Sequence, residues 1–72
     1  MGRDICVALG ERIRQLRTER GWRQIDLAEE AGIHENFVSD LEQGKKEACL
    51  RTIQTIANAF ELTVAELLKP VG

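Results

Sequence analysis

Residues 24–44 read Gln-Ile-Asp-Leu-Ala-Glu-Glu-Ala-Gly-Ile-His-Glu-Asn-Phe-Val-Ser-Asp-Leu-Glu-Gln-Gly and hold the strongest structural signal in the chain. Apolar residues first recur at the spacing of one helix face, at Leu27, Ala28 and Ala31. Gly32 then supplies the positive φ that a tight turn between helices favours. The residues expected to face inward after this turn are Ile33, Val38 and Leu41. The pattern predicts a helix over about 24–31 and a second over about 35–43, crossing at the small side chain of Ala28.

The side of the second helix that faces away from the core is polar. It carries Glu35, Asn36, Ser39 and Asp40. A helix that offers a polar edge to solvent while a partner helix braces it has the geometry that enters a DNA groove. Residues 24–43 are therefore predicted to form a helix-turn-helix motif.

Three further helices are predicted around this motif. The first runs over about residues 4–20, ends at Gly21, and turns inward Ile5, Leu9, Ile13 and Leu16. Another, over about 50–60, buries Leu50, Ile53, Ile56, Ala57 and Phe60. A short last helix over about 64–68 begins after Thr63, which forms a capping box with Glu66. Since no segment alternates like a strand, we expect an all-α fold of five helices in one domain spanning residues 1–72, with residues 50–68 completing the core.

Composition limits the functions open to this chain of 72 residues. No apolar run could span a membrane and no signal peptide is visible, so we expect a cytoplasmic protein without a membrane partner. Cys6, Cys49 and the single histidine lack the spacing of a metal site, so neither a metal nor another cofactor is expected. No set of catalytic side chains converges, so we do not expect an enzyme.

Charge is distributed unevenly, although the net charge is only −2. Residues 1–23 hold six arginines against three acids, whereas residues 24–44 hold six acids and neither lysine nor arginine. Residues 45–51 are basic again, with Lys45, Lys46 and Arg51 against Glu47. The motif is thus acidic but flanked by positive charge, which permits phosphate contacts from the flanks and base contacts from the centre.

Several short motifs follow one another in a fixed register between about Leu9 and Leu68. They are Ile-Arg-Gln-Leu-Arg at 13–17, Gln24-x-x-Leu27-Ala28, Gly32-Ile33, Val38-Ser39-x-Leu41-Glu42-x-Gly44 and Leu50-x-x-Ile53-x-x-Ile56-Ala57. With them the chain resembles the phage-repressor, Cro-like (XRE-type) helix-turn-helix family, which has the five-helix lambda-repressor-like fold. Residues 34–42 also resemble the small controller proteins of restriction-modification systems. The resemblance implies a transcriptional regulator that binds a short, roughly palindromic operator of double-stranded DNA as a homodimer.

The resemblance also assigns roles to matching residues. Those that touch base edges in the family are Glu35, Asn36 and Asp40. Those implied to contact the DNA backbone or a thymine methyl are Gln24, Phe37, Ser39, Lys45 and Lys46, and Arg23 adds a cation near the backbone. Arg17 and Glu42 match a structural ion pair that bridges the first helix to the end of the third.

Two of these residues, Glu35 and Asp40, are acidic where relatives commonly have Gln, Arg or Lys. A carboxylate can accept from the amino group of cytosine, and Asn36 can form two hydrogen bonds with adenine. Near phosphates a carboxylate is repelled unless it finds such a donor, so specificity would come largely from rejecting wrong bases. The alternative is a solvated acidic face without base contacts. Arg23 stands where relatives place a serine or threonine helix cap, so that cap is expected to be lost.

Two questions stay open at the level of sequence. A set of apolar residues near the C-terminal end either forms a dimer interface or closes the core over the first and fourth helices: Leu62, Val64, Leu67, Leu68 and Val71. The chain is either a dimeric regulator, autoregulatory through its own upstream DNA, or an antitoxin or protein-interaction module whose acidic motif binds a basic protein partner.

Overall fold

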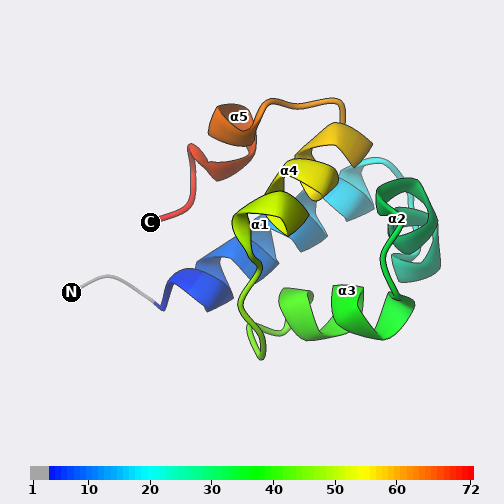
Figure 1. Cartoon of the computed structure of the whole chain (residues 1–72), viewed down its shortest axis with the longest axis horizontal. Coiled ribbons are helices and arrows are strands. Elements are labelled where there is room, and N and C mark those ends of the chain that lie inside the picture. Colours follow the sequence, from blue (N-terminus) through cyan, green and yellow to red (C-terminus); the bar gives the residue numbers. More distant parts are fainter. Residues whose placement is uncertain (1–3) are drawn as a thin grey trace.

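The computed structural model describes residues 4–72, and over these residues it contains five helices and no strand. In chain order they are α1 (Ile5–Glu19), α2 (Gln24–Ala31), α3 (Glu35–Glu42), α4 (Leu50–Ala59) and α5 (Val64–Leu68) (Figure 1). The predicted all-α, five-helix fold is confirmed. None of these helices is both long and apolar enough to cross a lipid bilayer.

The helix-turn-helix motif forms one end of the molecule. Contacts between helices join α1 to α3, α3 to α2, α2 to α4, and α4 to α5. In Figure 1, α2 and α3 lie together at one end, while α5 and the C-terminal end of the chain lie at the other. Gly32 makes the turn between α2 and α3 with a φ of 69°, as its position in the sequence predicted.

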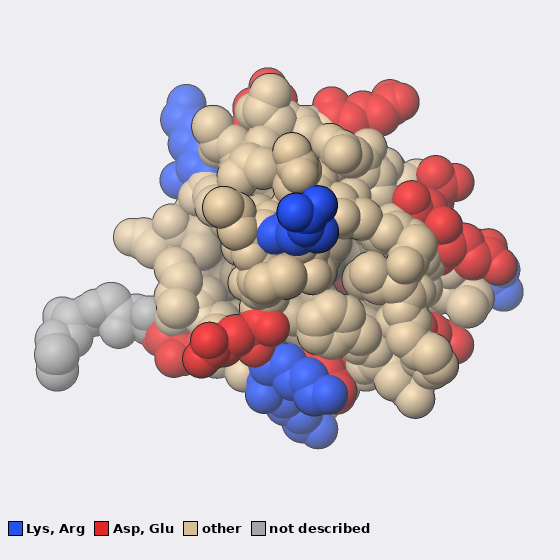
Figure 2. All heavy atoms as spheres, viewed as in Figure 1, with Lys and Arg blue, Asp and Glu red and all other residues tan. Residues whose placement is uncertain are grey.

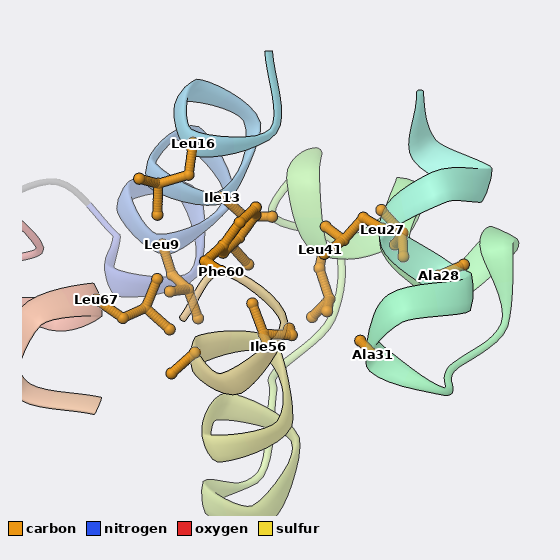
Figure 3. Packing of buried hydrophobic residues seen from close by; sticks show 12 residues of the cluster. Leu9, Ile13, Leu16, Leu27, Ala28, Ala31, Leu41, Ile56, Phe60 and Leu67 are labelled. Carbon is orange, nitrogen blue, oxygen red and sulfur yellow. The ribbon is translucent and has the colours of Figure 1, made fainter. Parts of the chain in front are cut away.

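One cluster of apolar side chains holds the five helices together (Figure 3). Its buried members are Leu9, Ile13, Leu16, Leu27, Ala28, Ala31, Val38, Leu41, Ile56, Ala57, Phe60 and Leu67. Phe60 is stacked on Trp22, with ring centroids 5.6 Å apart. The guanidinium of Arg20 lies 4.8 Å from the centroid of the Phe60 ring and donates to the Phe60 carbonyl at 2.7 Å. This stacking ties the end of α1 and the end of α4 to the segment that leads into α2.

Two residues predicted to be buried are exposed. Ile5 and Leu50 have exposed fractions of 58% and 75%. Each is the first residue of its helix, and the buried residues begin only at Leu9 in α1 and at Ile56 in α4. Helical spacing identifies the face that points inward, but it does not say where along the helix a neighbour begins to cover that face. The prediction was wrong at these two helix starts for that reason.

The last helix closes the core. Leu67 is fully buried, so it is a core residue, which is the second of the two alternatives that the sequence left open for it. Arg12 of α1 holds the end of α5 by donating to the carbonyls of Glu66 and Leu67, both at 3.0 Å. The other four interface candidates pack against the core but stay partly exposed: Leu62, Val64, Leu68 and Val71.

The backbones of α1 and α3 come close together at Gly10 of α1. A Cβ atom there would lie 2.3 Å from the carbonyl oxygen of Leu41 and 2.7 Å from that of Glu42. The backbone of α1 therefore packs directly on the last turn of α3, which only glycine allows. The sequence indicated Ala28 as the small residue at the helix crossing, and Gly10 was not anticipated.

Candidate nucleic-acid interface

The polar edge of α3 faces solvent. Glu35 and Asn36 are exposed and Asp40 is partly exposed, whereas Val38 and Leu41 on the opposite side are buried. Figure 1 shows α3 near the lower edge of the molecule, with the other four helices above it. The structure thus brings the three predicted base-reading residues together on an edge that no described segment covers.

Two predicted backbone or methyl contacts are partly engaged within the protein. Phe37 packs against the core cluster, so only part of its ring is free to meet DNA. The hydroxyl oxygen of Ser39 accepts from the side-chain amide of Gln43 at 2.8 Å. The hydroxyl proton of Ser39 remains available as a donor to a phosphate.

An ion pair fixes the far end of α3. Arg17 of α1 donates from Nε and Nη2 to the two carboxylate oxygens of Glu42, at 2.6 and 3.1 Å. Its Nη1 also donates to the carbonyl of Trp22, at 2.7 Å. The side chains of Arg17 and Glu42 are only 12% and 4% exposed. A two-pronged pair in this setting sets both distance and orientation, so α3 is held rigidly against α1.

The start of α2 presents backbone donors. The N–H groups of Asp26 and Leu27 donate to the Arg23 carbonyl at 3.0 and 3.2 Å, while in the described part of the chain those of Gln24 and Ile25 have no acceptor. Free N–H groups at a helix start suit an anionic ligand. The side-chain amide of Gln24 is already bonded to Glu42, at 3.1 Å from Nε2 to Oε1.

Arg23 occupies the N-cap position of α2 without accepting a hydrogen bond, because a guanidinium offers only donors. Asp26 compensates in part: its carboxylate accepts from the Arg23 backbone N–H at 2.7 Å and from the Arg23 side chain at 3.1 and 3.2 Å. The positive charge of Arg23, which is predicted to lie near the DNA backbone, is therefore offset by Asp26. The sequence signal for this pairing is the acid three residues after the N-cap position.

We expect Asp26 to make the stability of the fold pH-dependent in acid. The hydrogen bond from the Arg23 side chain, followed by that from its backbone, lowers the pKa of Asp26. Asp26 therefore stabilises the fold above its ordinary pKa, and this contribution is lost as the pH falls below about 4. Thermal unfolding followed from pH 7 to pH 2 should give a flatter decline for Asp26→Asn and for Arg23→Met. An unchanged decline in both variants would contradict this role.

The loop after α3 carries the predicted phosphate donors. Lys45 and Lys46 are exposed, and Lys46 Nζ lies 3.5 Å from Asp40 Oδ2. In Figure 2 a basic group stands at the lower edge, where this loop lies in Figure 1, and acidic groups occupy the right-hand side near α2. The carboxylate of Asp40, a predicted base-reading residue, is therefore partly neutralised by Lys46, which is predicted to contact the DNA backbone.

The fold and the exposed, braced α3 define a helix-turn-helix DNA-binding domain. The family model described as helix-turn-helix matches residues 13–67, and the chain belongs to this family of DNA-binding transcriptional regulators, which are not enzymes. Within residues 4–72 no group of histidine, cysteine and acidic side chains could hold a metal ion.

Relatives support the same class. The chain is 44% identical over 63 residues to the HTH-type transcriptional regulator DdrOP3 of Deinococcus deserti, covering 88% of this chain but 49% of that protein, so it spans about half of that relative's length. It is 30% identical over 69 residues to the control protein C.BamHI of Bacillus amyloliquefaciens, covering 94% of this chain and 85% of that protein. Among solved structures, the restriction-modification controller protein C.AhdI from Aeromonas hydrophila has a TM-score of 0.83 at 34% identity, covering 86% of this chain and 94% of that chain. The resemblance drawn from the sequence motifs is confirmed.

Proposed function

We propose that this chain is a cytoplasmic, homodimeric regulator that binds a short palindromic operator, including one upstream of its own coding region. The observation that carries the proposal is the uncovered polar edge of α3, held by the contact at Gly10 and by the Arg17–Glu42 pair. A rigid edge of this kind can distinguish bases in the major groove.

Each part of the interface has its own task in this proposal. Asn36 pairs with adenine, and the carboxylates of Glu35 and Asp40 accept from cytosine amino groups. Gln24 contacts the DNA backbone at the start of α2, and Lys45 and Lys46 contact it from the loop after α3. The further backbone or methyl contacts are Arg23, Phe37 and Ser39. Phosphate contacts set the register, and the edge of α3 reads the sequence.

A dimer is needed because one α3 and a few phosphate contacts bind too weakly at cellular salt. Leu50 and Val64 line one surface hollow together with Arg51 and Gln54. The face over α4 in Figure 2 is largely free of charge apart from one basic group. We place the interface on this face, with Leu50 at its centre and Leu62, Leu68 and Val71 as the remaining candidates.

Replacing Leu50 by glutamate should raise the dimer dissociation constant about tenfold or more, since it places a charge in the apolar centre of the interface. Sedimentation at micromolar concentration measures the effect. Gln15→Glu is the control, because Gln15 is exposed on α1 and lines neither the hollow at Leu50 and Val64 nor the one at Leu68 and Val71, and it should leave the dimer intact. A wild-type chain that is strictly monomeric contradicts the dimer.

Replacing Glu35 by glutamine should raise the affinity for duplex DNA of mixed sequence about threefold. The change removes one negative charge next to the phosphates, where Coulomb repulsion in water is about 1 kcal/mol. Fluorescence anisotropy at low salt measures it, and Glu61→Gln, in the turn between α4 and α5, is the control. Unchanged or weaker binding by Glu35→Gln would count against a carboxylate at the DNA surface.

Selection from a pool of randomised duplexes tests the proposed function. We expect two half-sites centred about 10 base pairs apart, and the same sequence should be protected in the DNA upstream of the coding region. If no duplex is enriched while a basic protein partner binds the acidic surface of α2 and α3, the chain is an interaction module instead.

A further inference from the structure

The carboxylate of Glu42 has one more bond than an ion pair with Arg17 requires. Oε2 accepts from Arg17 Nε, and Oε1 accepts both from Arg17 Nη2 and from Gln24 Nε2. The side chain of Glu42 is 4% exposed, so these bonds lie out of solvent. The last residue of α3 is therefore bonded to the first residue of α2, eighteen positions earlier.

The bond from Gln24 uses one of the two N–H groups of its amide. The amide is planar, so once the first N–H is fixed on Glu42 the direction of the second is fixed too. Gln24 is itself partly exposed, so the second N–H is not sealed in the core. Gln24 is also the first residue of α2, where the backbone N–H groups of Gln24 and Ile25 have no acceptor in the described chain.

The donors at this place carry no net charge. The guanidinium of Arg17 is neutralised by Glu42, and that of Arg23 is paired with Asp26 at 3.1 Å. What remains for a phosphate is the Gln24 amide and the start of α2. The binding of a phosphate here depends on how these N–H donors are directed rather than on their charge, so the protein must fix their direction.

We propose that Glu42 is a positioning residue for DNA binding: it fixes the Gln24 amide so that its second N–H meets a backbone phosphate together with the start of α2. The inference rests on the proposed function. Holding the side chain before DNA arrives removes the ordering cost of a flexible glutamine at an interface, which is worth about a two- to tenfold gain in affinity.

A double-mutant cycle tests this on a duplex of mixed sequence, because a phosphate contact does not depend on base sequence. Gln24→Ala and Glu42→Gln should each weaken binding about threefold or more. In the Gln24→Ala background, Glu42→Gln should then cost nothing further. Gln15→Ala, an exposed glutamine of α1, is the control and should bind as the wild type does.

The salt dependence separates this contact from the charged ones. Gln24→Ala should leave the slope of log affinity against log salt unchanged, since glutamine releases no counterion, whereas Lys46→Ala should reduce its magnitude by about one. If Glu42→Gln weakens binding equally in both backgrounds, Glu42 acts only on the fold, and the inference fails while the proposed function stands. If the wild type binds no duplex, both fail.

A measurement on the wild-type protein covers the case that Glu42→Gln does not fold. In the NMR spectrum of the free protein, the side-chain amide of Gln24 should be as ordered as the backbone, with an order parameter of about 0.85. The amide of Gln15 should be mobile. A Gln24 amide as mobile as that of Gln15 would overturn the inference.

Discussion

Replacing Gly10 by alanine is expected to destabilise the fold by about 3 kcal/mol or more, although alanine is the better helix former. In an unhindered helix the same change would stabilise by about 1 kcal/mol. Here the new Cβ would lie 2.3 Å from the Leu41 carbonyl oxygen and 2.7 Å from that of Glu42. These are backbone atoms that cannot rotate away, so α1 and α3 must separate.

The loss is large for a chain of this size, whose total stability is roughly 4–11 kcal/mol. Urea unfolding followed by circular dichroism measures it. Gly21→Ala is the matched control: Gly21 has a φ of 68° with open space around it, so alanine there costs only the backbone strain, about 1 kcal/mol. A Gly10→Ala variant at least as stable as the wild type would show that α1 and α3 do not meet at this residue.

Replacing Arg17 by methionine is expected to cost about 3–5 kcal/mol, because it leaves a buried carboxylate without its cation. Glu42 is 4% exposed and would keep only the bond from Gln24. Arg23→Met is the control for a lost ion pair at the surface, since Arg23 is 77% exposed. At neutral pH, Arg23→Met should lower the free energy of unfolding by no more than about 1 kcal/mol.

The double variant Arg17→Met with Glu42→Leu should recover most of this stability, since it removes both charges and fills the space with apolar groups. Urea unfolding of the single and double variants gives the comparison. The double variant should still bind DNA more weakly than the wild type, because Gln24 has lost its acceptor. Equal stability of the single and double variants would mean that Glu42 is not buried as described.

The order of the helices could be predicted because each carries its own local signal. Apolar spacing marked α1 and α4, Gly32 marked the turn of the motif, and Thr63 with Glu66 marked the start of α5. The prediction that Ile5 and Leu50 are buried was wrong, because burial depends on how far the neighbouring helices extend. The close approach at Gly10 was missed as well, because a glycine inside a helix gives no sign of what packs against it.

The candidate site, too, could be predicted from the sequence only in part. The polar edge of α3 follows from helical periodicity alone, since the residues opposite it are apolar. The pairing of Arg17 with Glu42 joins residues 25 positions apart, and only the family resemblance indicated it. Neither source indicated the bond from Gln24 to Glu42 or the pairing of Lys46 with Asp40, because both depend on how the side chains settle once the helices have packed.

An NMR titration of the labelled protein with a selected duplex tests whether the edge of α3 is the surface that reads DNA. We expect the largest shifts on residues 23–26 and 35–46, and we expect the side-chain amide of Asn36 to change most between the selected duplex and one of mixed sequence. Shifts confined to α4 and α5, or an Asn36 amide that does not distinguish the two duplexes, would contradict this expectation.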